Sequence, residues 1–159
     1  MNSPDGSLNV TLQVAVASTE VPDHIDCAAW IEAALVTGKH PAAGTVTVRL
    51  VDEQDSAQLN STYRHKAGPT NVLAFPGPGR DFPGPDTTAE LGDLVICWPV
   101  TCHEAAEQGK TALNHLTHLV VHGTLHLIGY DHQQVDEAEH MEQLEIRALN
   151  QLGIANPYA

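Results

Sequence analysis

Residues 45–51 read TVTVRLV, and apolar side chains recur there at every second position up to Leu50. A period of two predicts a β-strand with one buried face. Residues 8–16, LNVTLQVAV, alternate in the same way and predict another strand. Between the two, residues 23–38 read DHIDCAAWIEAALVTG, with apolar residues near helical spacing and a glycine at the end. We therefore expect a helix that joins the two strands and stops at Gly38.

After the strand predicted at 45–51, Asp55 and Ser56 are residue types that favour the start of a helix, and we expect a short helix to about Tyr63. Residues 71–75, NVLAF, predict a third strand, and residues 91–98, LGDLVICW, predict a fourth. The segment 76–87 between them, PGPGRDFPGPDT, holds four prolines and three glycines. It is expected to be a long loop, of a length that is often functional.

The C-terminal half is expected to be helical. Thr101 is followed three residues later by Glu104, a capping-box arrangement that predicts a helix beginning at Thr101. Further helices are expected over residues 112–127 and 135–152, and Gly153 ends the second of them. The core-facing positions of this last helix are predicted to be Met141, Leu144, Ala148 and Leu149.

Strands and helices alternate along the chain, which predicts a sheet of about four strands covered by helices, of the α/β or α+β class. The 159 residues fit one domain, expected to span 1–159. The longest apolar runs are far shorter than the ~18–20 residues of a membrane span, and the first thirty residues contain no Lys or Arg. We expect a cytoplasmic protein without membrane contact. None of the cysteines forms a CxxC pair, so we expect buried thiols at Cys27, Cys97 and Cys102.

The chain is strongly acidic, with 20 Asp and Glu against 7 Lys and Arg and a formal charge of −13. Such a balance argues against the broad basic surface of a typical nucleic-acid-binding domain. The charge is unevenly distributed, because residues 56–80 contain no acidic residue and carry Arg64, Lys66 and Arg80. This acid-free window has a charge of +3, so the rest of the chain has −16. We expect an anionic substrate to dock near the window.

Six of the ten histidines lie between positions 115 and 140, and the informative stretch is HGTLHLIGYDH, residues 122–132. On a helix, His122 and His126 project from one face about one turn apart, so both can bind the same metal ion. Gly129 can turn the chain back and bring His132 to the same point. Three histidines with an open fourth position are typical of catalytic zinc sites. We therefore expect one zinc ion bound by His122, His126 and His132.

The same spacing occurs in metzincin proteases, which carry a glutamate directly after the first histidine as general base. This chain has Gly123 at that position, so peptide hydrolysis is the less favoured chemistry. Zinc lowers the pKa of bound water to about 7, and a hydroxide nucleophile does not need the glutamate. His115 and His118 lie on much the same helix face. If His118 or a cysteine supplied a fourth ligand, the metal would instead be structural.

The histidine run, together with NSTYRHKAGPTNVLAFP at 60–76, LGDLVIC at 91–97 and the closing LNQLGIANPY, resembles the YbeY family of bacterial endoribonucleases. The similarity extends from about residue 45 to 158. It implies a single α+β domain with a small mixed sheet and a metal bound by three histidines. It also implies single-strand-specific endoribonuclease activity, maturation of the 3′ end of 16S ribosomal RNA, and ribosome quality control. The implied partners are single-stranded RNA, precursor ribosomal RNA and the small ribosomal subunit, and no DNA is expected.

The resemblance carries the family's functional arginine over to Arg64. An arginine near the metal also suits phosphodiester chemistry, because its guanidinium presents a fork of donors to phosphate oxygens. Lys66 and Arg80 are expected to be surface charges that could touch backbone phosphate. Asp131 either orients a histidine or only holds the turn. Two other classes of function stay open: a metallohydrolase acting on peptides or small molecules, and a non-catalytic ribosome-assembly factor with a structural metal.

Overall fold

Four strands form one mixed sheet in the part of the chain that this computed structural model describes, residues 8–16, 21–22, 25–77, 90–130 and 134–158. They are β1 (Leu8–Val14), β2 (Gly44–Val51), β3 (Val72–Pro76) and β4 (Glu90–Cys97), in the spatial order β1-β2-β4-β3. β1, β2 and β4 run parallel, and β3 pairs antiparallel with β4. The expected mixed four-stranded sheet is thus confirmed.

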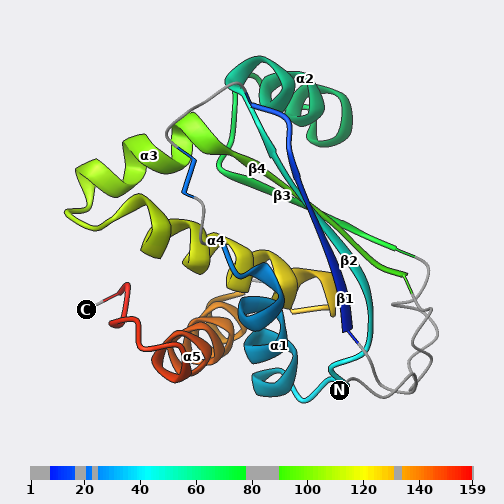
Figure 1. Ribbon diagram of the computed structural model, residues 1–159, viewed down its shortest axis with the longest axis vertical. Helices are drawn as coiled ribbons and strands as arrows, with labels where there is room; N and C mark the ends of the chain where they lie inside the picture. Colours follow the sequence, from blue (N-terminus) through cyan, green and yellow to red (C-terminus); the bar gives the residue numbers. More distant parts are fainter. Residues whose placement is uncertain (1–7, 17–20, 23–24, 78–89, 131–133, 159) are drawn as a thin grey trace.

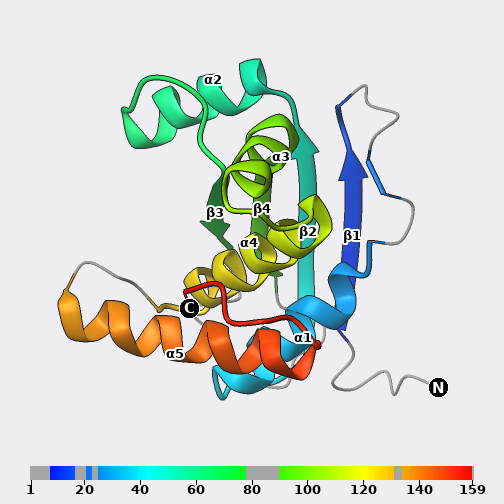
Figure 2. The same ribbon diagram turned by 90° about the vertical axis from the view of Figure 1, so that its left-hand side faces the viewer.

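The helices are α1 (Cys27–Thr37), α2 (Glu53–Arg64), α3 (Trp98–Glu107), α4 (Ala112–Leu127) and α5 (Val135–Gln151). Figure 1 shows α1, α4 and α5 gathered on one side of the sheet, with α2 at its upper end. In the turned view of Figure 2, α4 crosses in front of the strands and α5 lies below it. The arrangement is α+β, as the sequence predicts. None of the helices in the described residues has both the length and the apolar character of a membrane span.

The main core lies between the sheet and the helices α1, α4 and α5. The alternation in β2 puts Val46, Val48 and Leu50 on this side, each with 1% or less of its surface exposed. The predicted core positions of α5, Met141, Leu144, Ala148 and Leu149, are all buried in the same cluster. A smaller cluster on the opposite face consists of Val51, Leu73 and Val95, packed against Leu59 of α2. Both faces of the sheet are therefore covered at the end where α2 lies.

Two predicted helix starts are wrong. α2 begins at Glu53, two residues before Asp55, because the side chain of Asp52 caps it by accepting from the Asp55 amide. α3 follows β4 directly and begins at Trp98, with no side-chain cap and a proline in its first turn. Thr101 thus lies inside the helix, where its hydroxyl donates to the carbonyl of Cys97. The predicted capping box does not form.

Gly38 ends α1 as expected, but not by adopting a left-handed backbone, since its φ is −79°. A Cβ at Gly38 would lie 2.8 Å from Cδ1 of Ile128 and 3.2 Å from the Tyr130 ring. The glycine therefore lets the turn after α4 pack closely on the end of α1, where the Tyr130 hydroxyl donates to the Gly38 carbonyl. Gly129 has a φ of +106°, in agreement with its predicted role in turning the chain.

Several predictions fall on residues outside the described ranges. These include most of the loop 76–87, with Arg80, and the segment that holds Asp131 and His132.

Of the cysteines, Cys27 and Cys97 are buried and Cys102 is partly buried, and none forms a disulfide.

Candidate active site

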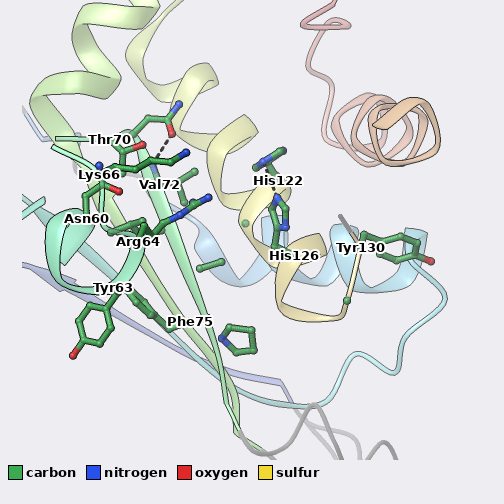
Figure 3. Close-up of a pocket in the computed structure, with 16 residues that line it drawn as sticks. Asn60, Tyr63, Arg64, Lys66, Thr70, Val72, Phe75, His122, His126 and Tyr130 are labelled. Atoms are coloured by element: carbon green, nitrogen blue, oxygen red, sulfur yellow. Dashed lines mark hydrogen bonds between the residues drawn. The ribbon is translucent and has the colours of Figure 1, made fainter. Parts of the chain in front are cut away.

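A groove of about 750 Å³ runs between α4, the edge strand β3 and the C-terminal end of α2. His122 and His126 line it from α4, and Arg64 and Lys66 line it from the end of α2 and the segment that follows. Figure 3 shows the Arg64 and Lys66 side chains directed across the groove toward the two histidines. Among the described residues that line the groove, none is an Asp or Glu.

His122 and His126 project side by side because they are four residues apart in α4, which is helical from Ala112 to Leu127 as predicted. Their Nε2 atoms are 3.2 Å apart. Two nitrogens bound at 2.0–2.1 Å to one tetrahedral zinc lie about 3.3–3.4 Å apart, so the observed spacing fits a shared zinc ion. His132 lies outside the described residues. Within the described ranges, no group of three or more metal-binding side chains occurs.

The carboxylate of Glu145 lies behind His122 and reaches it from α5. Its Oε2 is 3.1 Å from Nδ1 of His122, and its Oε1 is 2.6 Å from Nε2 of His118. The Glu145 side chain is only 1% exposed. Burial alone would raise the pKa of this carboxyl group, but hydrogen bonds from His118 and His122, with the charges of these rings, lower it to about 2. Glu145 is therefore an ionised, buried hydrogen-bond acceptor.

Tyr158, near the C-terminus, completes the surroundings of this carboxylate. Its hydroxyl donates to Oε1 of Glu145 over 2.8 Å, and its ring meets the His118 ring edge-on. Burial and the nearby charge of Glu145 raise the pKa of Tyr158, so the hydroxyl keeps its proton and remains a donor. His118 thus binds Glu145, and its Nε2 is engaged there.

Sequence reasoning did not identify Glu145 or Tyr158 as part of the site. The available signal for Glu145 was its position beside Leu144 and four residues after Met141, on the face of the helix predicted to be buried. A carboxylate in that position needs partners, because burying an unpaired charge costs several kcal/mol. Tyr158 lies in an irregular segment, where no periodicity gives the direction of a side chain.

His115 belongs to a different cluster. Its Nε2 is 2.8 Å from Oε1 of Glu104 on α3, and the same carboxylate accepts from the Asn71 side chain at the start of β3. Glu104, predicted to cap α3, instead joins α3, α4 and β3. Burial lowers the pKa of His115, which is 3% exposed and does not line the groove. His115 is therefore a core histidine that holds three elements together.

Gly123, which replaces the glutamate of metzincins, faces the sheet. A Cβ at this position would lie 2.7 Å from Cδ2 of Leu94 and 3.3 Å from Cγ2 of Val72. The helix crosses β3 and β4 too closely for a side chain there. The glycine is thus a packing requirement of α4, and the same close approach places His122 and His126 at the edge strand.

Arg64 is the last residue of α2, and His65 ends the helix in a left-handed conformation with a φ of +57°. The segment after it is pinned to α2 by two polar residues. The Asn60 side chain donates to the Gly68 carbonyl, and the Ser56 hydroxyl both donates to the carbonyl and accepts from the amide of Thr70. The basic wall of the groove is therefore held by hydrogen bonds.

An aromatic pair lies beside this basic wall. The Tyr63 ring meets the Phe75 ring edge-on, with centroids 5.3 Å apart, and both residues line the groove. Tyr63 is 61% exposed. Phe75 is partly buried, so Tyr63 offers the exposed ring of the pair. An exposed aromatic ring next to arginine and lysine suits the stacking and phosphate contacts of single-stranded nucleic acid.

The chain is similar to known endoribonucleases over most of its length. The model of the family described as endoribonuclease YbeY matches residues 14–153. Endoribonuclease YbeY of Methylococcus capsulatus is 52% identical, covering 95% of this chain and 95% of its own. The protein of the same name from Nitrosococcus oceani is 48% identical, covering 96% and 97%. The solved structure of TM1509 from Thermotoga maritima matches with a TM-score of 0.54 at 22% identity, covering 91% of both chains, which shows the shared fold.

Proposed function

Because the chain belongs to the YbeY family of endoribonucleases, we propose that its groove binds single-stranded RNA and that one zinc ion takes part in cutting the RNA backbone. The chain is thus a nuclease whose substrate is RNA. The observation that carries the assignment to this groove is that Arg64 lines it opposite the pair His122 and His126.

His122 and His126 would hold the zinc ion together with His132, the third histidine of the sequence motif. The 3.2 Å between the two Nε2 atoms and the acidic partner behind His122 support this donor set. Zinc bound there would supply Lewis-acid chemistry, which stabilises charge on a phosphate oxygen.

Arg64 acts as the second source of positive charge. A phosphodiester gains negative charge as a nucleophile adds, and the planar guanidinium can donate to two phosphate oxygens at once. The described lining of the groove contains no carboxylate that would repel the phosphate. Gly123 leaves the histidine pair without the general base of metzincins, which disfavours peptide hydrolysis. Because Glu145 binds His118, a structural site closed by His118 is also disfavoured.

We further propose that the RNA is precursor ribosomal RNA of the small subunit, with maturation of the 16S 3′ end and ribosome quality control as the cellular roles, in the cytoplasm. This part of the proposal is supported by the family alone. The preference for a single strand also has support in the groove, because Tyr63 and Phe75 can stack only with unpaired bases.

The test uses purified protein, before and after treatment with a chelator, on single-stranded RNA, double-stranded RNA and casein. We expect that only single-stranded RNA is cleaved. Removal of the metal should abolish this activity, and addition of Zn²⁺ should restore it. The terminal group of the product, 3′-hydroxyl or cyclic phosphate, then identifies the attacking group. Full RNA cleavage by metal-free protein would contradict the zinc assignment, and cleavage of casein would contradict the assignment to RNA.

A further inference from the structure

Glu145 lies behind one proposed ligand of the metal site, His122, and its two oxygens have different partners. Oε2 lies 3.1 Å from Nδ1 of His122, while Oε1 lies 2.6 Å from Nε2 of His118 and 2.8 Å from the Tyr158 hydroxyl. Oε1 accepts from the Tyr158 hydroxyl. Oε2 lies at hydrogen-bond distance from Nδ1 of His122, and a carboxylate behind a metal-binding histidine accepts from the ring nitrogen that faces away from the metal. This geometry places a hydrogen on Nδ1 of His122.

This hydrogen fixes the state of the other ring nitrogen. A neutral imidazole with a hydrogen on Nδ1 has its lone pair on Nε2, the atom that lies 3.2 Å from Nε2 of His126. A metal-binding histidine needs that lone pair on the side of the metal. Without the carboxylate, His122 could exchange tautomers and rotate about its side-chain bonds, and both changes would weaken binding.

We propose that Glu145 is a positioning residue, which holds His122 in the tautomer and orientation that bind zinc through Nε2. His118 and Tyr158 hold Glu145 in turn, because they occupy its second oxygen and keep the carboxylate plane from rotating. The segment that follows α5 is thereby linked to the site, since the Tyr158 hydroxyl donates to this carboxylate. The inference rests on the proposed function in that it uses the same histidines.

The main test replaces Glu145 with Gln, which keeps the shape and removes the charge. Zinc affinity is measured by competition with a chromophoric chelator, and we expect a loss of about 10- to 100-fold, as is usual for carboxylates that support a metal-bound histidine. The matched control is Glu139→Gln, an exposed position on the same helix, which should bind zinc like the parent. An affinity for Zn²⁺ within about twofold of the control would overturn the proposal.

A second readout does not depend on metal or RNA. In ¹⁵N-labelled, metal-free protein, the couplings between ring nitrogens and carbon-bound hydrogens report which nitrogen of His122 is protonated. We expect the hydrogen on Nδ1 in the parent and a mixture of tautomers in Glu145→Gln. A purely structural role would lower Tm and leave the tautomer unchanged, and a parent His122 with its hydrogen on Nε2 would also overturn the proposal. If the parent bound no zinc, the metal assignment would fail, while this measurement would still decide the role of Glu145.

Tyr158→Phe serves if Glu145→Gln does not fold. Tyr158 is 47% exposed, and the substitution removes only the hydroxyl that donates to Glu145. We expect a smaller loss of zinc affinity than for Glu145→Gln, with Tm close to that of the parent. Unchanged zinc affinity and an unchanged His122 tautomer in this variant would show that Tyr158 does not act through Glu145, and that part of the proposal would be withdrawn.

Discussion

The close approach of α4 to the sheet at Gly123 can be tested by adding a single carbon. In Gly123→Ala the new Cβ would lie 2.7 Å from Cδ2 of Leu94, well inside the normal carbon–carbon contact distance of about 3.5–4.0 Å. Leu94 is fully buried, so its side chain has little room to move away. Val72 on β3 lies 3.3 Å from the same Cβ on another side.

Two opposing effects set the size of the change in stability. Replacing glycine by alanine inside a helix normally stabilises by about 0.8–1.0 kcal/mol. Overpacking a core position costs about 1–3 kcal/mol. Their difference predicts a loss of roughly 1 kcal/mol in the free energy of unfolding, although helix propensity alone predicts a gain. For a chain of this size, such a loss lowers Tm by about 2–4 °C.

The assay is thermal unfolding followed by circular dichroism, with Asn114→Ala as the control. Asn114 is exposed in the first turn of α4, so alanine there brings the gain in helix propensity without crowding. We expect Tm to fall in Gly123→Ala and to stay the same or rise in the control. If both variants raised Tm by similar amounts, α4 would not be held tightly against β4, and close packing could not explain why glycine stands where metzincins have their glutamate.

Two further predictions concern the proposed catalytic groups. Arg64→Lys should reduce RNA cleavage by about 10²–10³-fold, since a contact to the charge of the transition state is worth about 2.7–4 kcal/mol. Its Tm and metal content should stay close to those of the parent. Similar cleavage rates in Arg64→Lys and in the exposed control Arg147→Lys would remove Arg64 from the mechanism. His126→Ala should lose stoichiometric metal and activity while keeping most of its helical signal, and metal analysis that finds one zinc per chain would refute its assignment as a ligand.

Features that depend on local spacing could be predicted from the sequence. The alternation of β2 and the helical period of α4 each depend on neighbours within a few residues, so the strands, the limits of α4 and the pairing of His122 with His126 followed directly. The errors have the same origin. Thr101 and Glu104 have the spacing of a cap, but Glu104 is drawn into contacts with Asn71 and His115, which the local pattern does not contain.

Contacts between distant segments could not be predicted in this way. Glu145 is 23 residues from His122, and Tyr158 is 40 residues from His118. The contacts that Glu145 and Tyr158 make in the site depend on how α5 and the C-terminal segment pack against α4. The position of Arg64 opposite the histidines likewise depends on where β3 and α2 lie relative to α4. The acid-free window and the family resemblance indicated a role for Arg64, but local spacing did not place it there.

The acidity of the chain has a consequence for RNA binding that salt can measure. With a formal charge of −13, most of the surface repels RNA, and the described wall of the groove offers two cations, Arg64 and Lys66. Each phosphate contact on a single strand contributes about −0.7 to the slope of log K against log salt, so two contacts predict a slope of about −1.4. Adding Arg80, the third cation of the acid-free window, would bring it to about −2.1 by the same rule. Arg64→Gln should flatten the slope by about 0.7, whereas Arg147→Gln, outside the groove, should leave it unchanged. A parent slope steeper than about −4 would mean that many more phosphates are bound than the groove can neutralise, and the idea of a short basic wall as the RNA contact would have to be abandoned.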